Sequence, residues 1–134
     1  MPIINYLAVL VAGVAGWIVG AVWYGVLGRQ WMEAAEIPSP DGRRRMPILP
    51  MIISFVALLL MALMLAGIIG HLGQPSLLIG IVSGNLVWLG FVITTIAVNY
   101  AFQGRKPMLT VIDGGHWLVV LIVQGAILGL FGQG

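Results

Sequence analysis

The sequence has no cysteine and very few charged residues. The absence of cysteine among 134 residues excludes disulfides and thiolate chemistry. Only 7% of the residues are charged, whereas ordinary soluble domains have roughly 25%. A soluble protein of this size could not cover its surface with so few charges, and 60% of the residues are hydrophobic. The composition therefore predicts an integral membrane protein.

The apolar residues form long runs. The hydrocarbon core of a bilayer is roughly 30 Å thick, which about 20 helical residues cross. Backbone groups have no partners in lipid, so each run must be helical. We predict an all-α integral membrane protein, a single domain over residues 1–134 that forms a compact bundle of four transmembrane helices. The four spans are approximately residues 3–27, 48–69, 77–102 and 109–131.

The few basic residues indicate the orientation of the chain. All six lysines and arginines lie in the connections between spans one and two and between spans three and four. Positive residues stay cytoplasmic, so both termini are predicted on the non-cytoplasmic side, and we expect the formal charge of +2 to set topology, not to bind nucleic acid.

The cytoplasmic loop 28–47 is the only sizeable polar segment. We expect a short interfacial helix from Trp31 to Ile37, with the indole at the headgroup level. The loop also holds an arginine triplet, which either only fixes topology or also contacts anionic lipid heads. These candidates for lipid contact are Arg43, Arg44 and Arg45.

Two stretches of the chain match each other. AVWYGVLGRQWM (21–32) and AVNYAFQGRKPM (97–108) coincide at six of twelve positions. Both would end spans that run in the same direction, which favours a tandem parallel repeat of two helix hairpins, related by an axis along the membrane normal. The alternative is that any outside-to-inside span ends with an interfacial tyrosine, a glycine cap and an arginine.

The combination of NYLAVL, GAVWYGVLGRQWM, GFVITTIAVNYAFQGR and IDGGHWLV resembles the bacterial membrane family called domain of unknown function 1761. The resemblance runs along nearly the whole chain. It implies a small multi-pass bacterial membrane protein, and we expect its location to be the inner membrane. The family brings no established activity, so no catalytic or binding residue is transferred from it.

Polar side chains gather near the cytoplasmic ends of the spans. Asp113 and His116 share one helix face, and intramembrane polar residues point into a bundle or a cavity. The rise of 1.5 Å per residue places the other candidates at similar depth. The predicted cluster comprises Asp113, His116, Asn99, Tyr24 and Tyr100, and Asn85 and Gln124 form a predicted second contact near the outer side.

Two interpretations of this cluster compete. In the leading one, it binds or passes a small solute or a proton. In the other, it only packs helices, and the protein is structural or accessory. A lipid-interacting protein that uses the arginine triplet is a third candidate. One aspartate and two histidines are too few ligands for a metal, and no intramembrane nucleophile accompanies Asp113 and His116, so we expect no metal, no cofactor and no enzymatic activity.

Small residues recur at spacings of four. Such residues let helix backbones approach closely, either inside a bundle or between subunits. We therefore expect a homo-oligomer that forms through these faces. Lipid is the expected partner of the outer surface of the bundle. The residues are Ala12, Gly16 and Gly20 in span one, Gly80 and Gly84 in span three, and Gly125 and Gly129 in span four.

Overall fold

A computed structural model describes residues 4–37 and 48–131, and all regular structure in these ranges is helical. Four helices are long and apolar enough to cross a membrane, which agrees with the all-α class and the four apolar helices predicted from the sequence. In chain order the elements are α1 (Tyr6–Ala35), α2 (Ile48–His71), α3 (Leu77–Val87), the π-helical segment η1 (Trp88–Val92), α4 (Ile93–Phe102) and α5 (Pro107–Phe131).

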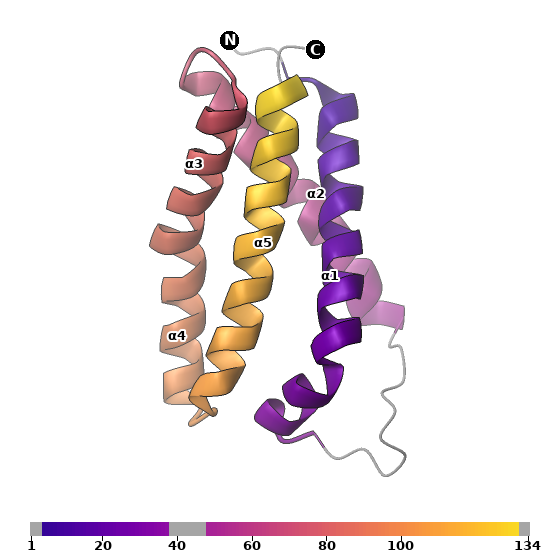
Figure 1. Cartoon of the computed structure of the whole chain (residues 1–134), viewed down its shortest axis with the longest axis vertical. Helices are drawn as coiled ribbons and strands as arrows, with labels where there is room; N and C mark the ends of the chain where they lie inside the picture. The colour runs from indigo at the N-terminus through magenta and orange to yellow at the C-terminus, as the bar shows by residue number, and fades with distance from the viewer. Residues whose placement is uncertain (1–3, 38–47, 132–134) are drawn as a thin grey trace.

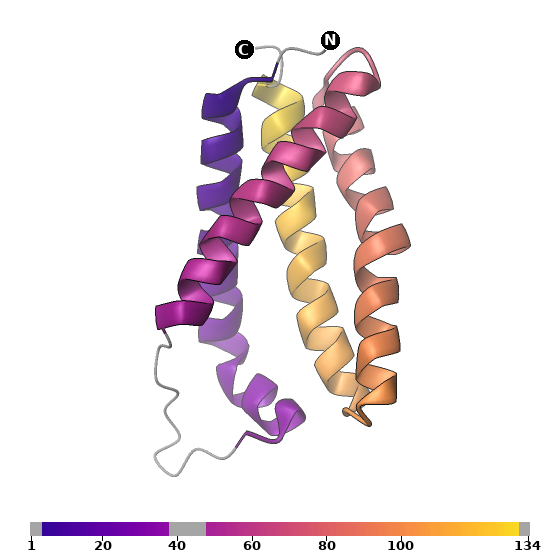
Figure 2. The same cartoon turned by 180° about the vertical axis from the view of Figure 1, so that it is seen from behind.

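Successive spans run in opposite directions, so α1 and the rod of α3, η1 and α4 share one direction (Figure 1). Helix α2 crosses the bundle obliquely, as the view from behind shows (Figure 2). The first and last spans meet where the side-chain amide of Asn5 donates to the carbonyl of Phe131 at 2.8 Å. We call this the terminal end of the bundle, and the opposite end, with the turn between α4 and α5, the turn end.

Helix α1 is longer than the sequence predicted. It continues through Gly28 and ends at Ala35, where Glu36 takes a left-handed conformation with φ of 57°. The predicted interfacial helix from Trp31 is therefore wrong as a separate element, because residues 31–35 are the last turns of α1. These turns bend toward α5 (Figure 1).

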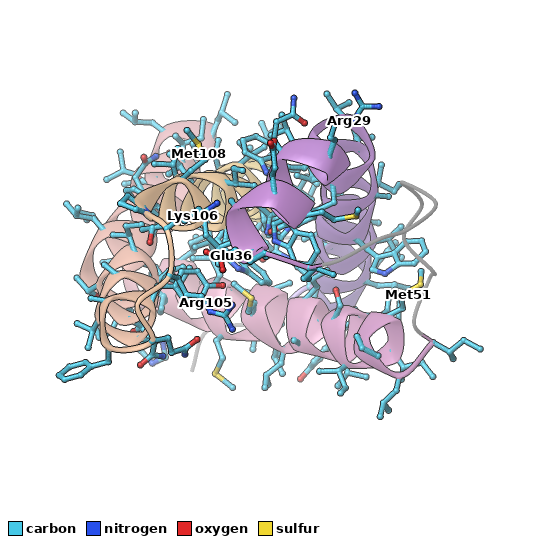
Figure 3. The ribbon with its side chains drawn as sticks, turned by 90° about the horizontal axis from the view of Figure 1, so that it is seen from below. Arg29, Glu36, Met51, Arg105, Lys106 and Met108 are labelled. Carbon is cyan, nitrogen blue, oxygen red and sulfur yellow. The ribbon has the colours of Figure 1, made fainter. Side chains whose placement is uncertain are left out.

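Packing explains why α1 continues past its glycine. Ala34 and Ala35 are buried against the first turns of α5. The Arg105 guanidinium donates to the Ala35 carbonyl at 3.3 Å, and the Lys106 ammonium donates to the Glu33 carbonyl at 3.5 Å. Cations at the C-terminus of a helix bond its free carbonyls and interact favourably with its dipole. Seen from the turn end, these two cations lie around the end of α1 (Figure 3).

Helix α5 is the centre of the bundle. It packs against α1, α2 and α3 and has more buried residues than any other helix, whereas α4 has none. Its contact with α3 is made by backbone atoms. A Cβ atom on Gly80 would lie 1.8 Å from the Gly125 carbonyl oxygen, and one on Gly129 would lie 2.1 Å from the Ser76 carbonyl oxygen. Only glycine allows this approach.

The small-residue face of α1 is also inside the chain. Ala12 is fully buried, and a Cβ atom on Gly16 would lie 3.0 Å from the Gln124 amide nitrogen and 3.1 Å from a Leu58 methyl group. The small residues of α1, α3 and α5 thus join helices of one chain. The homo-oligomer predicted through these faces loses that basis, because the faces are already covered.

The sequence predicts a single regular helix for the third span. The structure instead interrupts this span with the π-helical segment η1. A π-helical turn inserts one residue into the helix and changes the face that the following residues present. The next turn satisfies carbonyls of this segment with side chains. Thr94 donates to the Gly90 carbonyl at 3.0 Å, and Thr95 donates to the Phe91 carbonyl at 2.5 Å.

Replacement of Gly80 tests the backbone contact between α3 and α5. We expect Gly80→Ala to destabilise the protein by at least about 1–3 kcal/mol, because the added methyl group forces two backbones apart. Gly67→Ala is the matched control, since a Cβ atom there would meet nothing within 4 Å. Thermal unfolding in detergent, followed by circular dichroism, measures the difference. Equal melting of the two variants would contradict the close contact.

Candidate functional site: a carboxylate bonded by three aromatic donors

The side chain of Asp113 lies inside the bundle and is 8% exposed. Both of its carboxylate oxygens accept hydrogen bonds. The Tyr24 hydroxyl donates to Oδ1 at 2.6 Å, and the Trp31 indole donates to the same oxygen at 3.0 Å. The Tyr100 hydroxyl donates to Oδ2 at 2.5 Å. Donors from α1 and α4 therefore converge on one carboxylate of α5.

The two donors of α1 are seven residues apart, which places them two turns apart on one helix face. Their rings contact each other edge to face, with centroids 6.0 Å apart. The bend of the last turns brings Trp31 back toward α5, so it reaches the same oxygen as Tyr24. Tyr100 reaches the other oxygen because α4 and α5 are joined by a short turn, where Gly104 has a φ of 68°.

Two further indoles bond the backbone on either side of the carboxylate. Trp23 donates to the Ile112 carbonyl at 3.0 Å, and Trp88 donates to the Gly114 carbonyl at 2.8 Å. An indole N–H in an apolar environment needs an acceptor. Donors from α1, η1 and α4 therefore all bond residues 112–114.

Two glycines leave room for these contacts. A Cβ atom on Gly114 would lie 2.6 Å from the terminal methyl group of Ile93. A Cβ atom on Gly115 would lie 3.0 Å from the Trp23 ring. The dipeptide after Asp113 therefore allows α4 and α1 to approach α5 from two sides.

His116 and Gln124 continue the polar face of α5 toward the terminal end, with exposures of 6% and 0%. The imidazole packs against the Tyr24 ring, with centroids 4.9 Å apart. The Gln124 amide nitrogen donates to the carbonyls of Leu58 at 3.1 Å and Ala12 at 3.4 Å. Within the described ranges, His116 Nδ1 and Gln124 Oε1 are buried without a hydrogen-bond partner.

The structure brings four of the five predicted cluster residues together and excludes Asn99. That side chain is exposed on α4, so its predicted place beside Asp113 is wrong. Its depth was judged from the rise per residue, which does not determine the side of the helix. Adjacent residues are rotated by about 100°, so Asn99 points away when Tyr100 faces Asp113.

The predicted second contact is not formed. Asn85 donates to the Ile81 carbonyl of its own helix at 2.9 Å, while Gln124 bonds carbonyls of α1 and α2. The three arginines proposed to contact lipid heads, residues 43–45, lie outside the described residues.

Three indole donors of this candidate site were not predicted from the sequence: Trp23, Trp31 and Trp88. The signal was available, because an indole in a membrane span must find an acceptor or lie at the interface. The sequence predicts Trp31 at the interface and gives no partner for the other two indoles.

Chemically, the site is a carboxylate that already accepts three hydrogen bonds. Among the described residues, no group of three or more potential metal ligands occurs.

Removal of single hydroxyl groups tests the two-sided bonding of Asp113. We expect Tyr24→Phe and Tyr100→Phe each to lower stability by about 0.6–1.7 kcal/mol, the range for one hydrogen bond in a membrane protein. Tyr6→Phe is the control, because Tyr6 is 71% exposed. Thermal unfolding in detergent gives the three values. If either cluster variant melts like Tyr6→Phe, that hydroxyl does not stabilise the carboxylate.

The profile of the family described as "Protein of unknown function (DUF1761)" matches residues 7–129, nearly the whole chain. The chain belongs to this family, and the resemblance seen in the sequence is confirmed. No curated protein and no solved structure matches the chain.

Proposed function

We propose that this member of the DUF1761 family is a multi-pass membrane protein of structural or accessory function, whose polar cluster fixes the arrangement of its helices. The observation that carries the proposal is the bonding of Asp113, whose two oxygens accept three hydrogen bonds at 8% exposure. A carboxylate that already accepts three hydrogen bonds, of the roughly four that its two oxygens can accept, is better suited to holding helices together than to binding a solute.

The surroundings of the cluster support the same function. The donors belong to α1 and α4, and each would lose its acceptor if Asp113 bonded a ligand instead. Leaving such a buried donor unsatisfied costs about 1–3 kcal/mol. We therefore also propose that the chain has no enzymatic activity, since the aspartate that could act as a base is engaged in this way.

Passage of a proton or a small solute is the second candidate, favoured by one observation. His116 Nδ1 and Gln124 Oε1 lie on the same polar face of α5 as Asp113 and are buried without partners in the described ranges. An unsatisfied buried polar atom invites a water molecule or a ligand. In this function the path would run along α5 from the turn end toward its middle.

Two replacements of Asp113 separate these functions. We expect Asp113→Asn to cost less than about 1 kcal/mol, because the amide keeps an acceptor for α1 and can donate to Tyr100. Asp113→Leu leaves three donors without an acceptor and should cost about 2–5 kcal/mol. Val111→Leu, at a position 64% exposed on the same helix, is the control. Thermal unfolding in detergent supplies these values.

Proton flux in proteoliposomes, followed with a pH-sensitive dye, completes the test. The structural function predicts that the wild type and Asp113→Asn are equally impermeable. A wild-type flux that Asp113→Asn abolishes, with unfolding unchanged, would exclude the structural function and establish the second candidate.

For the topology, we propose that the turn end is cytoplasmic and the terminal end faces outward, in the bacterial inner membrane. The support is the arginine and lysine of the α4–α5 turn, Arg105 and Lys106.

The tandem repeat also stays a proposal. It is supported by the common direction of α1 and α3–α4 and by its matching tyrosines, Tyr24 and Tyr100, which bond the two oxygens of one carboxylate.

Cysteine labelling tests the topology, since the chain has no cysteine of its own. Gln74 and Gln103 are exposed in turns at opposite ends of the bundle. We expect Gln74→Cys to react with an impermeant maleimide on intact cells, and Gln103→Cys to react only after permeabilisation. The reverse pattern would invert the topology, and labelling of both from outside would exclude four membrane spans.

A further inference from the structure

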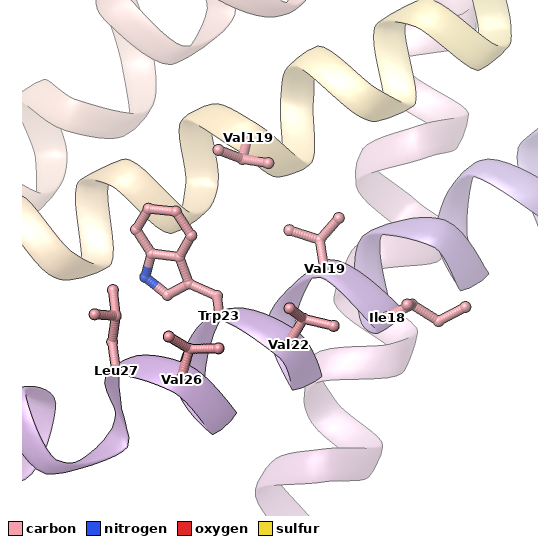
Figure 4. Close-up of a pocket in the computed structure, with 7 residues that line it drawn as sticks. All are labelled: Ile18, Val19, Val22, Trp23, Val26, Leu27 and Val119. Atoms are coloured by element: carbon pink, nitrogen blue, oxygen red, sulfur yellow. The ribbon is translucent and has the colours of Figure 1, made fainter.

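A groove opens on the side of the bundle between α1 and α5. Its volume is about 450 Å³, which lies in the ~300–1,000 Å³ range of small-molecule sites. The lining is almost wholly apolar, so the groove suits a hydrocarbon ligand. The residues that line it are Ile18, Val19, Val22, Trp23, Val26 and Leu27 of α1 and Val119 of α5 (Figure 4).

The groove has a direction and a length. Ile18, Val22 and Val26 follow one another at intervals of four along α1, and Arg29 continues this stripe one turn later. From Ile18 to Arg29 the helix rises roughly 16 Å. Half of the hydrocarbon core of a bilayer is about 15 Å. The stripe is therefore about as long as one leaflet is deep, and it ends in a cation.

The cation of this stripe differs from the other two in the described ranges. Arg105 and Lys106 donate to carbonyls at the end of α1, whereas the Arg29 guanidinium makes no hydrogen bond or ion pair with any described residue, its neighbour Glu33 included. Viewed from the turn end, Arg29 lies at the edge of the bundle, apart from the other two cations (Figure 3).

We propose that this groove binds one anionic phospholipid, with an acyl chain along the stripe of Ile18, Val22 and Val26 and the headgroup phosphate on Arg29. An arginine fork matches the oxygens of a phosphate, and an apolar groove of leaflet depth matches an acyl chain. The Trp23 indole N–H is already bonded to the Ile112 carbonyl, so the ring presents its apolar surface to the chain. The proposal does not rest on the role of Asp113, and the two sites share one residue, Trp23.

Native mass spectrometry of the detergent-solubilised chain tests the site, with phosphatidylglycerol and phosphatidylcholine added separately. Val22→Trp fills the groove, and Val98→Trp is its control at a comparably exposed position of α4, because the two valines are 60% and 55% exposed. Arg29→Gln removes the headgroup contact, and Arg105→Gln removes a charge elsewhere. Thermal unfolding confirms that each variant used is folded.

We expect one retained phosphatidylglycerol molecule on the wild type and on both controls, and much less phosphatidylcholine. Val22→Trp should abolish retention, and Arg29→Gln should weaken it about five-fold, the effect of one basic residue near a membrane surface. Equal retention of both lipids with no effect of Arg29→Gln would overturn the proposal. So would unchanged retention in Val22→Trp, or a dimer that Val22→Trp dissociates, which would assign the groove to a second copy of the chain.

Discussion

A carboxyl group inside a helix bundle has no bulk water to bond, so its oxygens need donors from the protein itself. Asp113 has three such donors on α1 and α4, and the carbonyls on either side of it accept two more from α1 and η1. These bonds set the rotation of α1 and α4 about their axes, because each donor must face α5. The bend at the end of α1 also serves this constraint, since it brings an indole within reach of the carboxylate.

The central place of α5 depends on its glycines, which have no side chain and so leave room for the neighbouring helices. Gly114 and Gly115 allow side chains of α4 and α1 to contact the helix beside the carboxylate, and Gly125 and Gly129 allow the backbone of α3 to do so near the terminal end. Glycine weakens a helix in water by about 1 kcal/mol. Within lipid the backbone has no competing hydrogen-bond partners, so a glycine-rich helix persists and close packing becomes available.

Sequence reasoning predicted the spans because hydrocarbon thickness and backbone bonding leave few solutions. It also identified Asp113, His116 and the two tyrosines, because polar groups in lipid must face protein. Sequence reasoning was wrong where the direction of a side chain around the helix axis decides its contacts. The depth of Asn99 along its helix matches that of Asp113, but the Asn99 side chain is exposed on the outside of α4. The last turns of α1 pack against α5, and Trp88 of the π-helical segment bonds the Gly114 carbonyl of α5. No local pattern in the sequence records either contact.

The position of the acceptor along the chain has a consequence for biogenesis. Asp113 is translated after every one of the aromatic donors that bond residues 112–114, because those donors belong to α1, η1 and α4. Until α5 enters the membrane, those indoles and hydroxyls have no native acceptor, and Gly80 and Gly84 of α3 lack the α5 backbone that they contact. The first three spans can insert, but their final rotation waits for the fourth. Assembly of this bundle is therefore completed by its last span, and a nascent chain that stops at the α4–α5 turn lacks the contacts that define the fold.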